Sequence, residues 1–133
     1  MPATARPLSP DDSLFGRVIL LIEDHADSAE WLAMSLRFVG ARVFVVGSVK
    51  DAERQIQTYR PDLIICDVRL PDGTGTDFIR WLRRRDKRHG GAVPCIAVTA
   101  YNVDFPLPGF NGFMRKPLDL AKLCNMAAQL LRR

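Results

Sequence analysis

Charged and hydroxyl side chains follow four of the apolar runs in this sequence. They are Glu23 and Asp24 after residues 18–22, Asp67 after 63–66, Thr99 after 95–98 and Lys116 after 112–114. Crowded carboxylates repel one another, and a hard divalent cation such as Mg²⁺ relieves that repulsion through oxygen ligands. Beside such a cation, Asp67 can act as a nucleophile and form an aspartyl phosphate.

The remaining two groups suit the same chemistry. Lys116 would balance charge on the oxygens of a transferred phosphoryl group, and Thr99 would donate a hydrogen bond to one of them. Taken singly, a carboxylate after a strand is usually a cap or loop charge, and Thr99 or Lys116 would be unremarkable. The interpretation therefore depends on all of these positions meeting in one fold.

The elements that must bring them together alternate along the chain. Unbroken apolar runs, typical of strands buried on both faces, occupy residues 18–22, 43–46, 63–66, 95–98 and 112–114. Helices are predicted over 27–39, from Ser48 to before Pro61, around Phe78, Ile79 and Leu82, and after Asp119. This alternation predicts an α/β fold with a parallel sheet covered on both faces, whose ligands sit at the carboxyl ends of the strands.

The first predicted helix has a start, an apolar pattern and a stop in the sequence. Asp27 is its expected N-cap, with Glu30 in the position of a near capping box. Gly40 is the expected C-terminal stop. Apolar residues recur at roughly helical spacing between these ends: Trp31, Met34, Leu36 and Phe38.

The composition is that of one globular domain. The chain has 133 residues, of which 47% are hydrophobic and 26% charged. The proline-containing segment 1–15 is predicted to be a disordered arm, and residues 16–133 the folded domain. No apolar run approaches the roughly 18 residues of a membrane span. Three cysteines without metal-like spacing predict small buried residues in a reducing compartment, so we expect a cytoplasmic protein.

Positive charge gathers near the end of the third predicted helix. The formal net charge is +4, and the cluster consists of Arg83, Arg84, Arg85, Lys87 and Arg88. Cations favour a helix C-terminus, so a solvated basic terminus is the preferred interpretation. A weak docking patch for an acidic partner stays open. No aromatic residues alternate with these cations, so direct nucleic-acid binding is not expected.

Four segments together resemble the receiver domain of response regulators in two-component signalling. They are residues 18–24, 62–75, 96–100 and Lys116-Pro117, and the resemblance runs from about Arg17 to Leu131. It implies a doubly wound five-stranded sheet of order 2-1-3-4-5, the flavodoxin-like receiver fold. It also implies a cis Lys116–Pro117 peptide bond.

The resemblance implies a role for each site residue. Asp67 is the phosphoacceptor. Glu23 and Asp24 are the acidic pair, and the protein ligands of Mg²⁺ come from this pair, from Asp67 and from the carbonyl of Arg69. Lys116 pairs with the phosphoryl group.

Two further positions match the conformational switch of the family. Thr99 is expected to move toward the phosphoryl group, and Phe113 to turn inward behind it. Plain core packing of Phe113 is the alternative.

The sequence departs from the family between Thr99 and Lys116, where the interval is short. Two prolines and a glycine in residues 101–111 argue against a regular helix. The fourth helix is therefore predicted to be short or absent. Phe105, Leu107 and Phe110 would fold back over the gap or stand exposed as a partner site.

The expected function is a phosphorylation switch without turnover as an enzyme. The phosphodonor would be a sensor histidine kinase or a histidine phosphotransfer protein, and the output a contact with an unknown protein. Because the chain ends at Arg133 after the last helix, a complete chain would be a stand-alone receiver. The alternative is a receiver-like binding module that does not use phosphate. A phosphatase of the haloacid dehalogenase type is disfavoured because Arg69 stands where its second aspartate would be.

Overall fold

The computed structural model describes residues 14–100 and 107–132, and its centre is a five-stranded parallel sheet. The strands are β1 (Val18–Ile22), β2 (Arg42–Val46), β3 (Leu63–Asp67), β6 (Cys95–Thr99) and β7 (Gly112–Arg115). They lie side by side in the order β2-β1-β3-β6-β7. The predicted order 2-1-3-4-5 is therefore confirmed.

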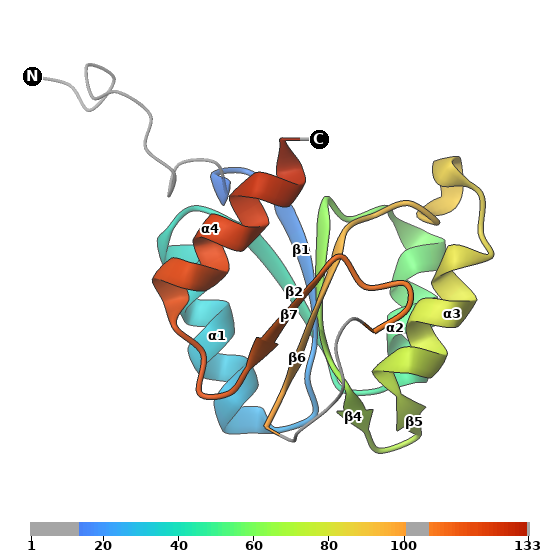
Figure 1. Ribbon diagram of the computed structural model, residues 1–133, viewed down its shortest axis with the longest axis horizontal. Coiled ribbons are helices and arrows are strands. Elements are labelled where there is room, and N and C mark those ends of the chain that lie inside the picture. Colours follow the sequence, from blue (N-terminus) through green and yellow to red (C-terminus); the bar gives the residue numbers. More distant parts are fainter. Residues whose placement is uncertain (1–13, 101–106, 133) are drawn as a thin grey trace, which may run out of the picture.

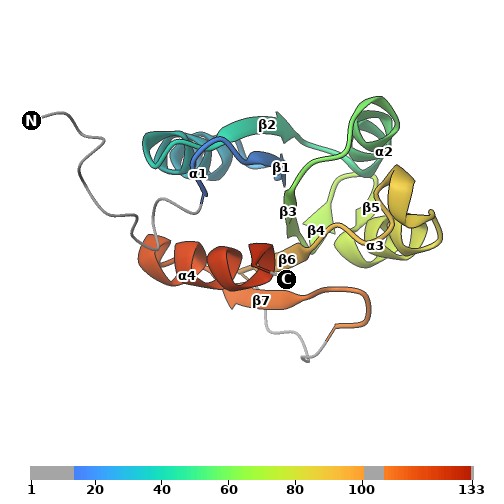
Figure 2. The same cartoon turned by 90° about the horizontal axis from the view of Figure 1, so that it is seen from above.

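Four α-helices in the described residues cover the two faces of the sheet. They are α1 (Ala26–Phe38), α2 (Val49–Thr58), α3 (Gly75–Arg83) and α4 (Leu120–Leu131). Helices α1 and α4 lie on one face, and α2 and α3 on the other (Figures 1 and 2). Each face has its own apolar core, because β1, β3 and β6 are apolar up to the residues that end β3 and β6, Asp67 and Thr99, and turn alternate side chains to opposite faces.

The caps predicted for the second and last helices are confirmed. The Ser48 side chain accepts a hydrogen bond from Asp51 N at the start of α2. Asp119 accepts one from Lys122 N at the start of α4. These bonds satisfy backbone N–H groups that the first helical turn leaves without a partner.

The start of α1 differs from the prediction. The helix begins at Ala26, and its N-cap is His25, which makes no side-chain capping bond, so the prediction of Asp27 as N-cap is wrong. The buried face consists of Ala29, Leu32, Ala33 and Leu36. Of the four larger apolar residues, only Leu36 belongs to it, while Trp31, Met34 and Phe38 are 49%, 61% and 91% exposed.

Three short elements were not predicted. Residues 69–74 contain the antiparallel pair β4 (Arg69–Leu70) and β5 (Gly73–Thr74). A 3-10 helix, η3 (Lys87–His89), lies directly before Gly90 and Gly91. Thr74 forms a full capping box with Asp77 at the start of α3.

The link between β6 and β7 is described only in its second half. Residues 107–111 contain a turn and no helix, in agreement with the predicted loss of the fourth helix. Phe110 packs against the core on the α2–α3 side, so the expected return over the gap is confirmed for this residue. Phe105 and the rest of 101–106 lie outside the described residues.

The chain before β1 is also described only in part. Residues 1–13 of the expected arm lie outside the described residues, whereas Leu14 is fully buried in the core with α1 and α4. The three cysteines are free and buried, as expected. No helix in the described part of the chain is long and apolar enough to cross a membrane.

Candidate functional site

The predicted site residues lie at the carboxyl ends of neighbouring strands. The β1–β3 register pairs Ile22 with Cys66, so the next residues, Glu23 and Asp67, lie side by side. The chain runs from β1 outward to β2 and then returns across β1 to β3, so this crevice is the topological switch point of the sheet. Binding sites of such sheets form at this point because the connecting loops diverge there.

Asp67 is held from both sides. It is 4% exposed at the end of β3. Its Oδ1 accepts a hydrogen bond from Arg69 N at 3.1 Å, and its Oδ2 accepts one from Lys116 Nζ at 3.0 Å. The carboxylate is therefore buried, oriented and next to one cation.

Gly75 supports the backbone of Asp67. A Cβ atom at Gly75 would lie 2.6 Å from the carbonyl oxygen of Asp67 and 3.1 Å from Cα of Val68. Gly75 N also donates a hydrogen bond to Val68 O at 2.7 Å. Helix α3 can thus start directly behind the carboxylate only with glycine at this position.

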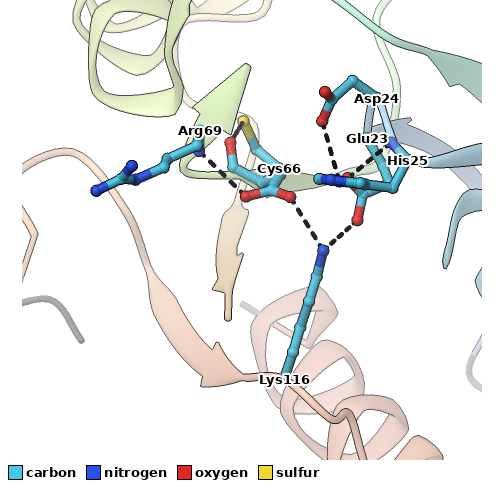
Figure 3. A network of polar contacts seen from close by, with 7 residues as sticks. Glu23, Asp24, His25, Cys66, Arg69 and Lys116 are labelled. Carbon is cyan, nitrogen blue, oxygen red and sulfur yellow. Dashed lines mark hydrogen bonds and ion pairs between the residues drawn. The ribbon is translucent and has the colours of Figure 1, made fainter. Parts of the chain in front are cut away.

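Lys116 joins the two buried carboxylates. Its ammonium donates hydrogen bonds to Glu23 and to Asp67 (Figure 3). Burial raises the pKa of the Glu23 carboxyl, and the bond from Lys116 offsets only part of this effect. Burial alone would lower the pKa of Lys116, but its hydrogen bonds to Glu23 and Asp67 outweigh burial and leave that pKa raised.

A group of possible metal ligands lies in the same crevice. The ligand atoms of Glu23, Asp24, His25 and Asp67 all lie within 4.8 Å of one another. Three of these residues were predicted. Carboxylate oxygens this close suit a hard divalent cation, so the residues present fit Mg²⁺. The role expected for the carbonyl of Arg69 stays a prediction.

His25 is the member of this group that the sequence analysis missed. Its Nδ1 lies 3.3 Å from Asp24 Oδ1 and 3.4 Å from Glu23 Oε2 (Figure 3). Its backbone N also donates to Glu23 Oε2 at 3.3 Å. The only sequence signal was its place directly after the acidic pair.

The two residues predicted to form the switch lie on the two strands beyond Asp67. Thr99 ends β6 and is fully buried, and Phe113 on β7 is half-buried and paired in register with Ala97. Lys116 N donates to Thr99 O at 2.8 Å, so the backbones of these two site residues are joined. The predicted cis bond between Lys116 and Pro117 is present.

Two hollows meet at this site. One, of about 320 Å³, opens over Asp67 and includes Asp24, His25, Ala100 and Lys116 in its lining. The other lies between the start of α1 and the loop after β7 and was not predicted. Its lining includes Glu23, Trp31, Leu32, Lys116, Pro117 and Leu118.

Comparison with curated proteins agrees with this arrangement. Residues 19–128 match the response regulator receiver domain. The chain is 31% identical over 116 residues to an uncharacterized 14.6 kDa protein in the sodA1 3' region of Leptolyngbya boryana, with 84% of this chain and 87% of that protein covered. It is 32% identical over 120 residues to the KDP operon transcriptional regulatory protein KdpE of Escherichia coli, with 86% of this chain and 51% of that protein covered. The chain thus spans about half the length of that regulator.

Solved structures show the same likeness. The receiver domain of the sensor histidine kinase PA1611 of Pseudomonas aeruginosa PAO1 superposes with a TM-score of 0.82 at 30% identity, covering 89% of this chain and 99% of that chain. A magnesium ion is coordinated in the active site cleft of that structure. The signal receiver domain of a histidine kinase from Syntrophus aciditrophicus superposes with a TM-score of 0.78 at 29% identity, covering 88% of this chain and 91% of that chain.

Proposed function

The chain belongs to the response regulator receiver domain family, and we propose on this premise that it is a signalling switch that accepts a phosphoryl group on Asp67. The observation that carries the proposal is the setting of this carboxylate. It is buried at a strand end, with one oxygen bonded to Lys116 and the other to the backbone of Arg69. A carboxylate oriented in this way is prepared for attack on phosphorus.

The proposed donor is a phosphohistidine of a sensor histidine kinase or a histidine phosphotransfer protein. A carboxylate oxygen of Asp67 forms a bond to phosphorus while the bond between phosphorus and the histidine nitrogen breaks. That nitrogen keeps the electron pair. Lys116 is placed to balance charge on the transferred group, since its ammonium already lies 3.0 Å from Asp67 Oδ2.

Glu23, Asp24 and Asp67, with the carbonyl of Arg69, would hold Mg²⁺ in this crevice. When bound, the ion supplies positive charge for the phosphoryl oxygens and offsets the repulsion among the carboxylates. The proximity of the ligand atoms supports this proposal, as does the magnesium ion in the Pseudomonas aeruginosa receiver domain.

We propose that the phosphodonor binds at the second hollow, between the start of α1 and the loop after β7. It opens next to Glu23 and Lys116, and Trp31, which lines it, is half exposed. A donor helix seated there would bring its histidine close to Asp67. The free buried cysteines suit a reducing compartment, which supports our placing this encounter in the cytoplasm.

Phosphorylation is proposed to act through Thr99 and Phe113 on an unidentified output protein. Thr99 is buried at the end of the strand next to Asp67, and β6 is in turn paired with the strand that carries Phe113. A new phosphoryl group would attract the Thr99 hydroxyl, and the space it leaves behind would admit the Phe113 ring.

The proposal is tested by incubating the protein with Mg²⁺ and acetyl phosphate and measuring its intact mass. One added phosphoryl group is expected in the wild type. It should be lost in Asp67→Asn and when Mg²⁺ is replaced by EDTA. An adduct of equal yield in Asp67→Asn would contradict the proposal, because the acceptor would then be another residue.

The short link between β6 and β7 favours one alternative, a receiver-like module that binds a partner without using phosphate. Its described part, residues 107–111, contains no helix, which agrees with the departure from the family pattern seen in the sequence. Beryllofluoride with Mg²⁺ mimics an aspartyl phosphate and separates the two functions. Absence of both an acetyl phosphate adduct and beryllofluoride binding would favour the phosphate-independent module.

A further inference from the structure

The guanidinium of Arg83 lies between the loop before β6 and the link before β7 and donates hydrogen bonds to both. Its Nε donates to Gly109 O at 2.9 Å, and its Nη2 to Asn111 Oδ1 at 2.9 Å. Its Nη1 donates to the carbonyls of Gly91 at 3.0 Å and Val93 at 2.7 Å. One side chain of α3 therefore holds both the loop before β6 and the link before β7, which run beside α3 in Figure 1.

The link is fixed at two further points. Asn111 Oδ1 also accepts from Cys95 N at 2.8 Å, and Asn111 N donates to Cys95 O at 2.8 Å. Gly109 has a φ of +88°, and a Cβ atom there would lie 3.1 Å from Ile79 Cγ1. Because glycine is required for both the conformation and the close approach, the link lies directly against α3.

A groove forms where the link meets α3. Two members of the basic cluster seen in the sequence differ in direction, because Arg83 turns inward while Arg84 is exposed along the groove. Arg80, which precedes Arg84 by one helical turn and lies outside that cluster, is exposed along the same groove. Within the described residues, neither of these two arginines forms an ion pair with a carboxylate. The groove is lined by Thr76, Ile79, Arg80, Arg84, Pro108 and Gly109, with the Arg83 stem beneath.

We propose that this groove binds an acidic amphipathic segment of a partner protein. Apolar side chains of the segment would contact Ile79, Pro108 and the Arg83 stem, and its carboxylates would pair with Arg80 and Arg84. Charge complementarity decides the class of partner, because two exposed arginines that pair with no carboxylate of the described residues flank an apolar floor. None of the described residues that line the groove carries an aromatic ring on which a base could stack, which argues against nucleic acid.

The test uses the unphosphorylated protein, so its outcome is independent of the proposed phosphoacceptor. The probe is a fluorescein-labelled peptide of glutamate and leucine with the leucines at helical spacing, and binding is followed by fluorescence anisotropy. Peptides in which lysine replaces glutamate, or serine replaces leucine, report on charge and on apolar contact. Amide chemical shifts locate the bound peptide.

Two charge-reversal variants with equal net charge distinguish the groove from the general basic surface. Arg80→Glu/Arg84→Glu alters the groove, and Lys87→Glu/Arg88→Glu alters exposed cations on η3 outside it. The first should weaken binding at least about tenfold, and the second less than about twofold, since distant surface charges contribute little. Shift changes should gather at residues 76–84 and 107–111.

Three outcomes would overturn the proposal. The first is no saturable binding of the glutamate–leucine peptide. The second is an equal loss of affinity in the two variants, which would show attraction to positive charge without a groove. The third is tighter binding of the serine peptide or of single-stranded DNA, which would assign the arginines to polyanions in general.

Discussion

Lys116 Nζ donates a hydrogen bond to Asp67 Oδ2 at 3.0 Å, although 49 positions separate the two residues in the sequence. The same ammonium also contacts Glu23, so one positive charge lies between two buried carboxylates. Lys116 thus supplies positive charge between the acidic side chains that end β1 and β3.

Removal of this ammonium should destabilise the metal-free protein. Lys116→Met keeps most of the aliphatic volume but leaves Glu23 and Asp67 without their shared cation. We expect a loss of about 2 kcal/mol in the free energy of unfolding, below the range for a fully buried pair because the Lys116 side chain is 18% exposed. Urea denaturation in EDTA measures it. Mg²⁺ should restore more stability to this variant than to the wild type.

Lys122→Met is the matched control for that experiment. Lys122 lies on α4 with an exposed side chain, so its loss should change stability by less than about 0.5 kcal/mol. Equal urea midpoints for Lys116→Met and Lys122→Met would mean that the contact with Asp67 contributes nothing to the metal-free fold.

Mg²⁺ affinity should depend on pH through Glu23. Burial raises the pKa of this carboxyl in the folded metal-free protein. As the pH falls through that raised pKa, Glu23 takes up a proton that Mg²⁺ must displace, so affinity falls. As the pH rises above it, the full affinity is reached. Isothermal titration calorimetry with Mg²⁺ across a series of pH values measures this dependence. Glu23→Gln should bind Mg²⁺ more weakly, and its affinity should change less with pH than that of the wild type. Identical slopes in the two proteins would exclude Glu23 as the linked group.

Asp72 should stabilise the start of α2. Its carboxylate accepts hydrogen bonds from Val49 N at 2.8 Å and Lys50 N at 3.1 Å. Asp72→Ala should cost about 1 kcal/mol at neutral pH, as the loss of a helix cap does. Urea denaturation measures the difference between the two proteins.

The pH dependence of that difference has a definite sign. The backbone hydrogen bond from Val49, followed by that from Lys50, lowers the pKa of Asp72. The contribution of its charge is therefore present above the ordinary pKa of about 4 and is lost as the pH falls through the lowered folded value. Asp72→Asn, which keeps an oxygen acceptor, should retain most of the stability but lose this pH dependence. If the stability difference between the wild type and Asp72→Asn stayed the same in acid, the charge of Asp72 would not be the source of the pH dependence.

Gly75→Ala should displace the backbone of Asp67. The added Cβ would lie 2.6 Å from Asp67 O, and neither atom can move without shifting β3 or α3. We expect the free energy of unfolding to fall by about 3 kcal/mol, which is the upper end of the range for overpacking. We also expect slower phosphorylation by acetyl phosphate. Gly47→Ala is the control, because its nearest contact would be an ordinary 3.7 Å from Asp24 Cα. If both variants matched the wild type, α3 could not be the element that positions Asp67.

Much of the fold could be predicted because its signals are local. The four apolar runs that precede the site residues are the strands β1, β3, β6 and β7, and the parallel arrangement brings their carboxyl ends together. Asp67 and Lys116 could therefore be placed side by side without any contact being visible in the sequence.

What the sequence could not show depends on contacts between distant segments. Asp72 accepts hydrogen bonds from the backbone N–H groups of Val49 and Lys50, which lie 23 and 22 positions before it in the sequence. No local sequence pattern links Asp72 to these two residues. Arg83 resembled one more surface cation, because its four acceptors lie on segments that only the fold brings near. Trp31 matched a helical spacing, but its exposed position follows from where α1 meets the sheet.

The location of the phosphoryl group is the measurement that tests the central proposal most directly. After treatment with Mg²⁺ and acetyl phosphate, borohydride reduces an aspartyl phosphate to homoserine, which tandem mass spectrometry can assign to one position. We predict homoserine at residue 67 alone, and none when acetyl phosphate is omitted. Homoserine at Asp24 or at another carboxylate, with none at residue 67, would contradict the assignment of Asp67 as the acceptor.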